Sequence, residues 1–156
     1  TGLDLKHIKP GPRITAIDLT PAMIWRLRRR ARRRALEVDA KVMDARALAF
    51  EDGAFDAVIL HLILAVVPDP TQCLREAARV LRPGGRAVIL DKFLADSRPV
   101  PLILRLLNLP LKLLGTNVTR KLGPLVEASG LRIVHQEPAG LGGFVKIVLL
   151  RKDGSP

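Results

Sequence analysis

The chain has 156 residues, of which 48% are apolar, and carries a formal net charge of +11. This length and composition suffice for the core of one domain and exclude an intrinsically disordered protein. The single cysteine, Cys73, excludes an intrachain disulfide, and no run of about 18 uncharged apolar residues predicts a membrane span. We expect one domain over residues 1–152, followed by a short tail at 153–156.

The first predicted strand runs from Arg13 to Asp18 and ends in a carboxylate. A helix should begin directly after it, because Thr20 is a favourable N-cap and Pro21 suits the first helical position. The helix is expected to continue to about Arg34, and its Arg26–Arg34 block holds seven arginines and no acid. Most of the net positive charge therefore lies in one local patch.

The same alternation continues along the chain. Val38–Met43 predicts a short strand followed by Asp44, and Phe55–Leu62 is almost wholly apolar, which is typical of a central parallel strand. Asp69 is the expected N-cap of a helix over residues 70–81. The rest of the chain predicts, in order, a turn at Arg82–Gly85, a strand at Arg86–Leu90, a leucine-rich segment at Pro101–Leu114, a helix at Asn117–Ser129, and strands at Leu131–Glu137 and Phe144–Arg151.

Strands that alternate with helices indicate an α/β fold whose sheet is mainly parallel, with right-handed crossovers. A carboxylate at the end of such a strand can accept hydrogen bonds from both hydroxyls of a ribose. Asp18 is in this position, and Leu19 is expected to pack on the base. The alternative is a helix-capping or loop acid. Because any nucleoside cofactor has a ribose, Asp18 alone does not distinguish one from another.

Four stretches occur here in one fixed order: RITAIDLTPAM, KVMDARAL, FDAVILHLILAVVPDP and LREAARVLRPGGRAVIL. Over nearly the whole chain this order resembles the class I S-adenosylmethionine-dependent methyltransferases. The resemblance implies a doubly wound, Rossmann-like sheet with an antiparallel C-terminal edge hairpin, S-adenosylmethionine as cofactor, and no metal. The absence of tyrosine argues against the Tyr-Lys pair of a short-chain dehydrogenase.

The resemblance also implies roles for individual residues. Asp44 and Ala45 match the position that reads the adenine amine, although a surface turn acid is the alternative. Thr1 and Gly2 resemble the end of the family's glycine-rich loop, where glycine lets the backbone approach the methionine part of the cofactor. We therefore expect the family's first strand to precede residue 1. The alternative is a short protein without that strand, whose sheet would expose two edges.

Two residues are candidates for proton transfer. His61 lies near the carboxyl end of a strand, where the family places a residue beside the cofactor and the acceptor; a satisfied core histidine is the alternative. Asp91, followed by Lys92, ends the next strand and could face the acceptor; an exposed ion pair is the alternative. A protonated amine cannot attack a methyl group, so either side chain could serve as the base, and we assign none.

Within the family, the chain resembles bacterial phospholipid N-methyltransferases of the phosphatidylethanolamine type. The residues that carry this resemblance are HLILAVVPDP (61–70), VILDKFL (88–94), LLGTNVTRKL (113–122) and GLGGFVKIVLLRK (140–152). It implies N-methylation of a phospholipid amine. Two alternatives stay open: C- or O-methylation of a quinone or another small molecule, and an inactive basic module that binds RNA or membranes.

Two segments predict peripheral contact with an anionic membrane. They are the Arg26–Arg34 block and the leucine-rich Pro101–Leu114 segment, whose polar residues form a narrow stripe at helical spacing. The alternatives are a solvated helix face for the first, and a buried helix or dimer contact for the second. Nucleic acid is a poorer partner, because few aromatic residues accompany the arginines. We expect a cytoplasmic location, peripheral at the inner membrane surface.

Overall fold

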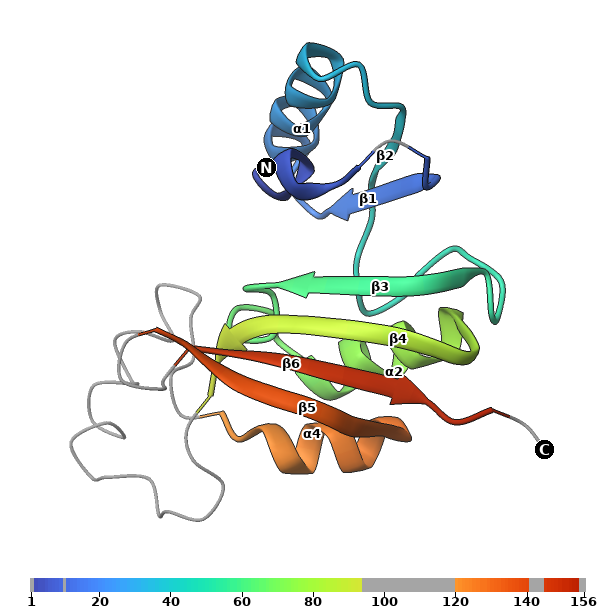
Figure 1. Ribbon diagram of the computed structural model, residues 1–156, viewed down its shortest axis with the longest axis vertical. Coiled ribbons are helices and arrows are strands. Elements are labelled where there is room, and N and C mark those ends of the chain that lie inside the picture. The colour runs from blue at the N-terminus through green and yellow to red at the C-terminus, as the bar shows by residue number, and fades with distance from the viewer. Residues whose placement is uncertain (1, 10, 94–119, 141–144, 155–156) are drawn as a thin grey trace. The chain divides into compact units, whose positions relative to one another are not determined.

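The structure is a computed structural model that describes residues 2–9, 11–93, 120–140 and 145–154. The chain divides into two compact units, Thr1–Ala49 and Phe50–Pro156 (Figure 1). The single domain expected over residues 1–152 stays a prediction, because two compact units can belong to one domain. The leucine-rich segment Pro101–Leu114 lies outside the described residues, as does Thr1.

The first unit contains a short 3-10 helix, two strands and one α-helix. They are η1 (Asp4–His7), β1 (Ile14–Asp18), α1 (Pro21–Arg33) and β2 (Val38–Val42). β1 and β2 are parallel, and their register runs from the Ile14–Val38 pair to the Asp18–Val42 pair. The predicted elements are confirmed to within about one residue. Thr20 is the N-cap residue of α1, although its side chain makes no capping hydrogen bond.

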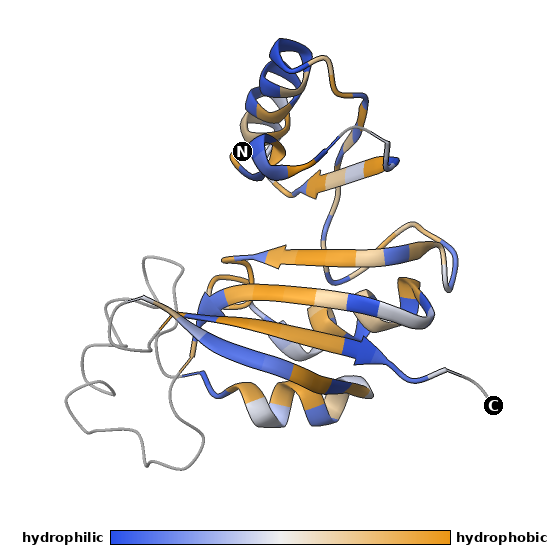
Figure 2. Ribbon diagram, viewed as in Figure 1, coloured by the Kyte–Doolittle hydropathy of each residue, from blue (hydrophilic) through white to orange (hydrophobic). Residues whose placement is uncertain are grey.

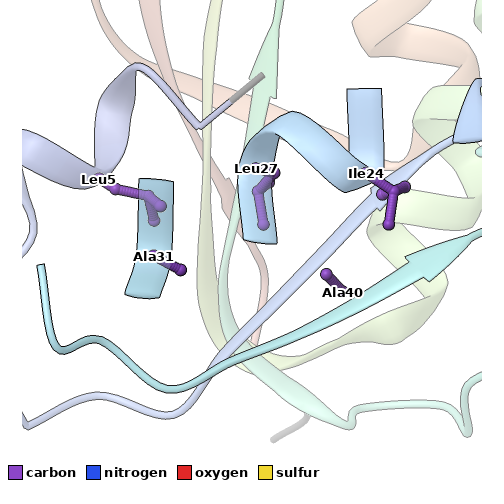
Figure 3. Packing of buried hydrophobic residues seen from close by; sticks show 5 residues of the cluster. All are labelled: Leu5, Ile24, Leu27, Ala31 and Ala40. Carbon is purple, nitrogen blue, oxygen red and sulfur yellow. The ribbon is translucent and has the colours of Figure 1, made fainter. Parts of the chain in front are cut away.

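The apolar face of α1 forms the core of this unit. Ile24, Leu27 and Ala31 are buried and gather with Leu5 of η1 and Ala40 of β2 (Figure 3). Their spacing of three and four residues places them on one helical face, while most of α1 is hydrophilic (Figure 2). Ala35, four residues after Ala31, does not extend this face, because it follows the helix with a φ of 51° and is exposed.

The second unit is a four-stranded sheet with two helices. Its elements are β3 (Phe55–His61), α2 (Pro70–Val80), β4 (Leu81–Lys92), α4 (Leu122–Ser129), β5 (Leu131–Gly140) and β6 (Val145–Lys152). The strand order is β3-β4-β6-β5. β3 and β4 are parallel, whereas β6 is antiparallel to both β4 and β5, which confirms the predicted C-terminal hairpin. α2 contacts β4 and α4, and α4 contacts β5 (Figure 1).

Local signals set the ends of α2. The Asp69 side chain accepts a hydrogen bond from the Gln72 backbone N–H at 2.9 Å, and Pro70 is the first helical residue. The chain enters β4 at Leu81, five residues before the strand start expected at Arg86, because Leu81 already pairs with Phe55 of β3. The register then shifts across Arg82–Gly85, which was predicted as a turn but lies within β4. The predicted end of α2 is confirmed to within one residue, since the helix ends at Val80.

The position of β3 differs from the prediction. Its apolar sequence predicted a central strand, yet it lies at one edge of the four-stranded sheet. Among the described strands, only β4 pairs with it, and its Ile59 side chain is 61% exposed. An apolar sequence reports that a strand suits burial, but pairing partners decide where the strand lies in a sheet.

Candidate functional site

In the first unit, the carboxyl ends of β1 and β2 bring two predicted acids close together along the backbone. The Met43 N–H donates a hydrogen bond to the Asp18 carbonyl oxygen at 3.1 Å, and Asp44 follows Met43 directly. Asp18 and Asp44 therefore lie at the same edge of the two-stranded sheet. This edge is where α/β proteins bind nucleosides.

Asp18 is half-buried, and its contacts suit a ribose. Its Oδ1 accepts a hydrogen bond from the Thr20 backbone N–H at 2.8 Å, which supports the start of α1. Within the described ranges, Oδ2 makes no hydrogen bond, so one carboxylate oxygen remains able to accept from hydroxyl groups. The neighbouring Leu19 side chain is 66% exposed and can cover an apolar ring. These properties fit a nucleoside cofactor.

Asp44 is engaged by a residue that the sequence analysis did not single out. The Arg46 guanidinium binds both carboxylate oxygens, with Nη2 to Oδ2 at 2.7 Å and Nε to Oδ1 at 3.1 Å. The Arg46 backbone N–H also donates to Oδ1, at 2.9 Å. The Arg46 side-chain hydrogen bonds, and then the backbone one, lower the pKa of Asp44. Nε also donates to Oδ2, at 3.1 Å, so Arg46 occupies most of the acceptor capacity of this carboxylate, and an adenine amine would share an oxygen with it.

Gly2 occupies a position that accepts only glycine without strain. Its φ is 73°, and an added Cβ would lie 3.1 Å from Leu5 Cδ1 and 3.2 Å from Leu27 Cγ. The missing side chain thus allows the chain to pass closely over α1. Glycine serves the same purpose in dinucleotide-binding loops, where it permits close packing against the helix. An approach to the cofactor itself stays a prediction.

In the second unit, the parallel strands β3 and β4 end with the two candidate bases. His61 pairs with Leu90 in the register, is exposed, and is the last residue of β3. Asp91 comes one residue after Leu90 and is fully buried. The alternative that Asp91 forms an exposed ion pair is therefore wrong. The sequence could not show this, because burial at a strand end depends on what packs over it.

The Asp91 carboxylate is held by backbone donors. Oδ2 accepts from the Ala65 N–H at 3.1 Å, and Oδ1 accepts from the Lys92 N–H at 2.8 Å. Burial raises the pKa of Asp91, whereas these hydrogen bonds act in the opposite direction. A carboxylate used in this way supports the fold around it. It is less suited than the exposed His61 to meet an acceptor.

Comparison with known proteins identifies the family. The sequence profile described as "Methyltransferase domain" matches residues 1–89. A phosphatidylethanolamine N-methyltransferase of Cereibacter sphaeroides is 32% identical over 146 residues, which cover 92% of this chain and 72% of that protein. The chain belongs to the S-adenosylmethionine-dependent methyltransferases. The predicted family, fold class, cofactor and enzyme class are thereby confirmed.

Two further similarities support the family and its fold. A demethylmenaquinone methyltransferase of Thermus thermophilus is 44% identical over 89 residues, which cover 57% of this chain and 40% of that protein. The solved structure of an S-adenosylmethionine-dependent methyltransferase from Methanosarcina mazei has a TM-score of 0.74 at 20% identity, and covers 97% of this chain and 87% of that one. The fold is therefore that of the Rossmann-like methyltransferases.

The methyltransferase carries one more charge, half-buried, to which the sequence analysis assigned no role. Arg120 lies within the LLGTNVTRKL stretch, and its Nη2 donates to the Val67 carbonyl oxygen at 2.7 Å. A lone arginine before a helix gives no local signal of burial. The sequence therefore pointed to this stretch but not to Arg120 in particular. For the membrane question, no helix in the described part of the enzyme has the length and apolar content needed to span a bilayer.

Proposed function

We propose that this methyltransferase N-methylates the amine of a phospholipid head group such as phosphatidylethanolamine. The observation that carries the proposal is the extent of the match to the Cereibacter sphaeroides enzyme, whose 146 matched residues must include most of the chain after β4. The menaquinone relative matches only 89 residues. Since acceptor specificity is built on top of a shared cofactor fold, the longer match is the more informative.

A quinone-like acceptor is the second candidate. Over its shorter match, the demethylmenaquinone methyltransferase is more similar to this chain, at 44% identity compared with 32%. A region common to many methyltransferases can produce such a difference, because all of them hold the same cofactor. The larger share of the chain that the phospholipid enzyme matches therefore favours a phospholipid acceptor over a quinone. The assay below distinguishes the two acceptors.

We assign the cofactor to residues at the strand ends of the first unit. Asp18 would accept from the ribose hydroxyls, Leu19 would cover the adenine ring, and Asp44 would accept from the adenine amine beside Ala45. When bound, S-adenosylmethionine supplies a methyl group on a sulfonium centre. The residues of this edge hold and orient it, which is the main contribution that a protein makes to such a reaction.

The acceptor amine must lose a proton before it can attack. Of the two candidates, His61 is exposed at the end of β3, whereas the buried Asp91 is engaged by backbone N–H groups. We therefore propose that an imidazole nitrogen of His61 takes this proton, directly or through water. A quinol acceptor would also have to lose a proton, from a hydroxyl group or a ring carbon.

The outer face of α1 supports a role at an anionic surface. Trp25, Arg28, Arg29, Arg32 and Arg33 line a hollow of about 470 Å³. The Arg29 guanidinium lies 5.6 Å from the centroid of the Trp25 ring, which is 61% exposed as a residue. Arginine with exposed tryptophan is a combination suited to the lipid head-group layer. We propose that this face meets anionic lipids while the enzyme acts.

A methyl-transfer assay with alternative acceptors tests the proposal. The purified enzyme is given labelled S-adenosylmethionine and phosphatidylglycerol vesicles that contain either phosphatidylethanolamine or a demethylated menaquinol. We expect label in the amine lipid and little in the quinol. Transfer to the quinol alone would overturn the phospholipid assignment in favour of the second candidate. Vesicles of phosphatidylglycerol alone give the background.

A further inference from the structure

The segment at residues 62–67, directly after β3, has a buried side and an exposed side. Leu64, Ala65 and Val67 are buried, with 0%, 4% and 8% of their surface exposed, whereas Leu62 and Val66 are 44% and 51% exposed. The backbone forms a tight turn, because the N–H groups of Val66 and Val67 both donate to the Ile63 carbonyl oxygen, at 3.0 and 2.8 Å. The turn thus exposes two apolar side chains, of which Leu62 directly follows His61 in the sequence.

The turn begins in an unfavourable backbone conformation. Leu62 has a φ of 53°, a left-handed value that is unfavourable for any residue with a side chain. Its N–H donates to the Leu90 carbonyl oxygen at 2.8 Å, which ties this residue to the end of β4. Conformations of this kind persist only when surrounding contacts determine them, and they are frequent at ligand-binding positions.

Two charged side chains supply such contacts: Asp91, which is buried, and Arg120, which is half-buried. The carboxylate of Asp91, 26 positions away, accepts from the Ala65 N–H at 3.1 Å. The guanidinium of Arg120, 53 positions away, donates to the Val67 carbonyl oxygen at 2.7 Å. Both interactions run from a side chain to the backbone of the turn. They therefore hold its shape while leaving the side chains of Leu62 and Val66 exposed.

Burial is electrostatically unfavourable for both charged groups. Burial raises the pKa of the Asp91 carboxyl and lowers the pKa of the Arg120 guanidinium. Arg120 Nη1 is buried and has no hydrogen-bond partner within the described ranges. Asp91 and Asp69 attract the Arg120 charge and oppose its neutralisation. A purely apolar core would avoid these desolvation costs.

We propose that Asp91 and Arg120 are positioning residues that hold the turn at residues 62–67 as a preformed platform for the methyl acceptor. This inference rests on the proposed function, because it takes the carboxyl ends of β3 and β4 as the acceptor side. The cofactor is assigned to residues of the first unit. Loss of either charge should therefore weaken use of the acceptor and leave cofactor affinity unchanged.

The test measures acceptor KM, kcat and S-adenosylmethionine affinity for Asp91→Asn, Arg120→Gln and Arg120→Lys. An asparagine amide accepts through one atom only, so Asp91→Asn loses one backbone partner. We expect acceptor KM to rise on the order of tenfold for Asp91→Asn and Arg120→Gln, since small displacements of a positioning element have large effects. Arg120→Lys should restore part of the loss, because an ammonium can still donate to the Val67 carbonyl oxygen.

Matched controls separate this role from a general effect on folding. Asp56→Asn and Arg132→Gln make the same chemical changes at exposed positions of the second unit, and should leave acceptor KM unchanged. Amide hydrogen exchange at Ala65 should speed up in Asp91→Asn well before global unfolding. If that variant does not fold, the Arg120 pair still decides the question.

Failure of the inference differs from failure of the proposed function. If the enzyme methylates phosphatidylethanolamine and the Asp91 and Arg120 variants keep wild-type acceptor KM, the positioning role is wrong and the function stands. If it methylates only a quinol, the function is wrong, but acceptor KM for that quinol should still rise. A parallel loss of cofactor affinity would also overturn the positioning role.

Discussion

Asp18 and Met43 are joined by a backbone hydrogen bond of 3.1 Å that places the ends of β1 and β2 side by side. This bond makes neighbours of two carboxylates, Asp18 and Asp44, that are 26 positions apart in sequence. One of them keeps an oxygen that no described residue engages, and the other is bound by Arg46. Their different surroundings lead to different predictions.

Replacement of Asp18 by alanine should weaken S-adenosylmethionine binding. Loss of a charge-assisted hydrogen bond to the ribose corresponds to about 1.5–3 kcal/mol, or roughly a ten- to hundredfold higher Kd. Calorimetric titration measures the change. Asp39→Asn is the control, because Asp39 is an exposed acid of β2 paired with Lys41. An unchanged Kd in Asp18→Ala would remove this residue from the cofactor site.

The pair of Asp44 and Arg46 should be visible in a pH titration. The Arg46 hydrogen bonds lower the pKa of Asp44 in the folded protein. The pair therefore stabilises the folded state fully at any pH above the pKa that Asp44 has in the unfolded chain. This contribution is lost as pH falls through the lower, folded-state pKa. In Arg46→Gln, the carboxyl carbon resonance of Asp44 should titrate nearer to the ordinary value of 3.8. Identical titration curves for the two proteins would contradict the pairing.

His61→Gln should slow methyl transfer without weakening cofactor binding. A general base contributes about a hundredfold or more to a rate, and glutamine cannot take up a proton. The measurement is kcat at saturating cofactor and acceptor, together with the Kd for S-adenosylmethionine. A rate within about twofold of wild type would mean that solvent deprotonates the acceptor. Gln is chosen because its amide keeps a polar group of similar size at the strand end.

The arginines on α1 should govern binding to anionic vesicles. Each contributes about 1 kcal/mol near such a surface, and this attraction weakens with salt. We expect Arg29, Arg32 and Arg33, changed together to Gln, to reduce co-sedimentation with phosphatidylglycerol vesicles and methylation of a lipid acceptor, with cofactor affinity intact. Arg28 is left in place, because its Nη2 donates to the Ala40 carbonyl oxygen at 2.6 Å.

The control for this prediction removes the same charge elsewhere. Arg82, Arg86 and Arg132 are exposed in the second unit, and their joint change to Gln lowers the net charge equally. If both triple variants lose vesicle binding to the same extent, net charge rather than the α1 face is responsible. Equal recovery with neutral and anionic vesicles would remove the electrostatic contact altogether.

The glycine pair before the main part of β4 should differ in tolerance to alanine. An added Cβ at Gly85 would lie 2.8 Å from the Arg82 carbonyl oxygen and 3.2 Å from the Asp56 carbonyl oxygen. Gly84 has free space around it but a φ of 74°, so alanine there costs roughly 1–2 kcal/mol. Gly85→Ala should lower the melting temperature more than Gly84→Ala, with Gly154→Ala neutral. The reverse order would contradict the packing.

Much of this protein followed from local sequence signals. Asp69 and Pro70 predicted the start of α2, and the Arg82–Gly85 turn predicted its end, because capping and backbone conformation depend on neighbouring residues. The strand-end position of Asp18 also came from its place between an apolar run and a helix start. For the same reason the family pattern, which is a series of such junctions, was recognisable along the chain.

Tertiary structure decided which polar groups are buried and what they hold. Asp91 looked like an exposed strand-end acid, yet it is fully buried against the backbone of Ala65. Arg120 gave no local signal, but it contacts the carbonyl of a residue 53 positions earlier. Leu62 has a left-handed φ of 53°, and its N–H is bound by the carbonyl oxygen of Leu90, 28 positions later. Burial and strain arise from contacts between segments far apart in sequence, so no local pattern could reveal them.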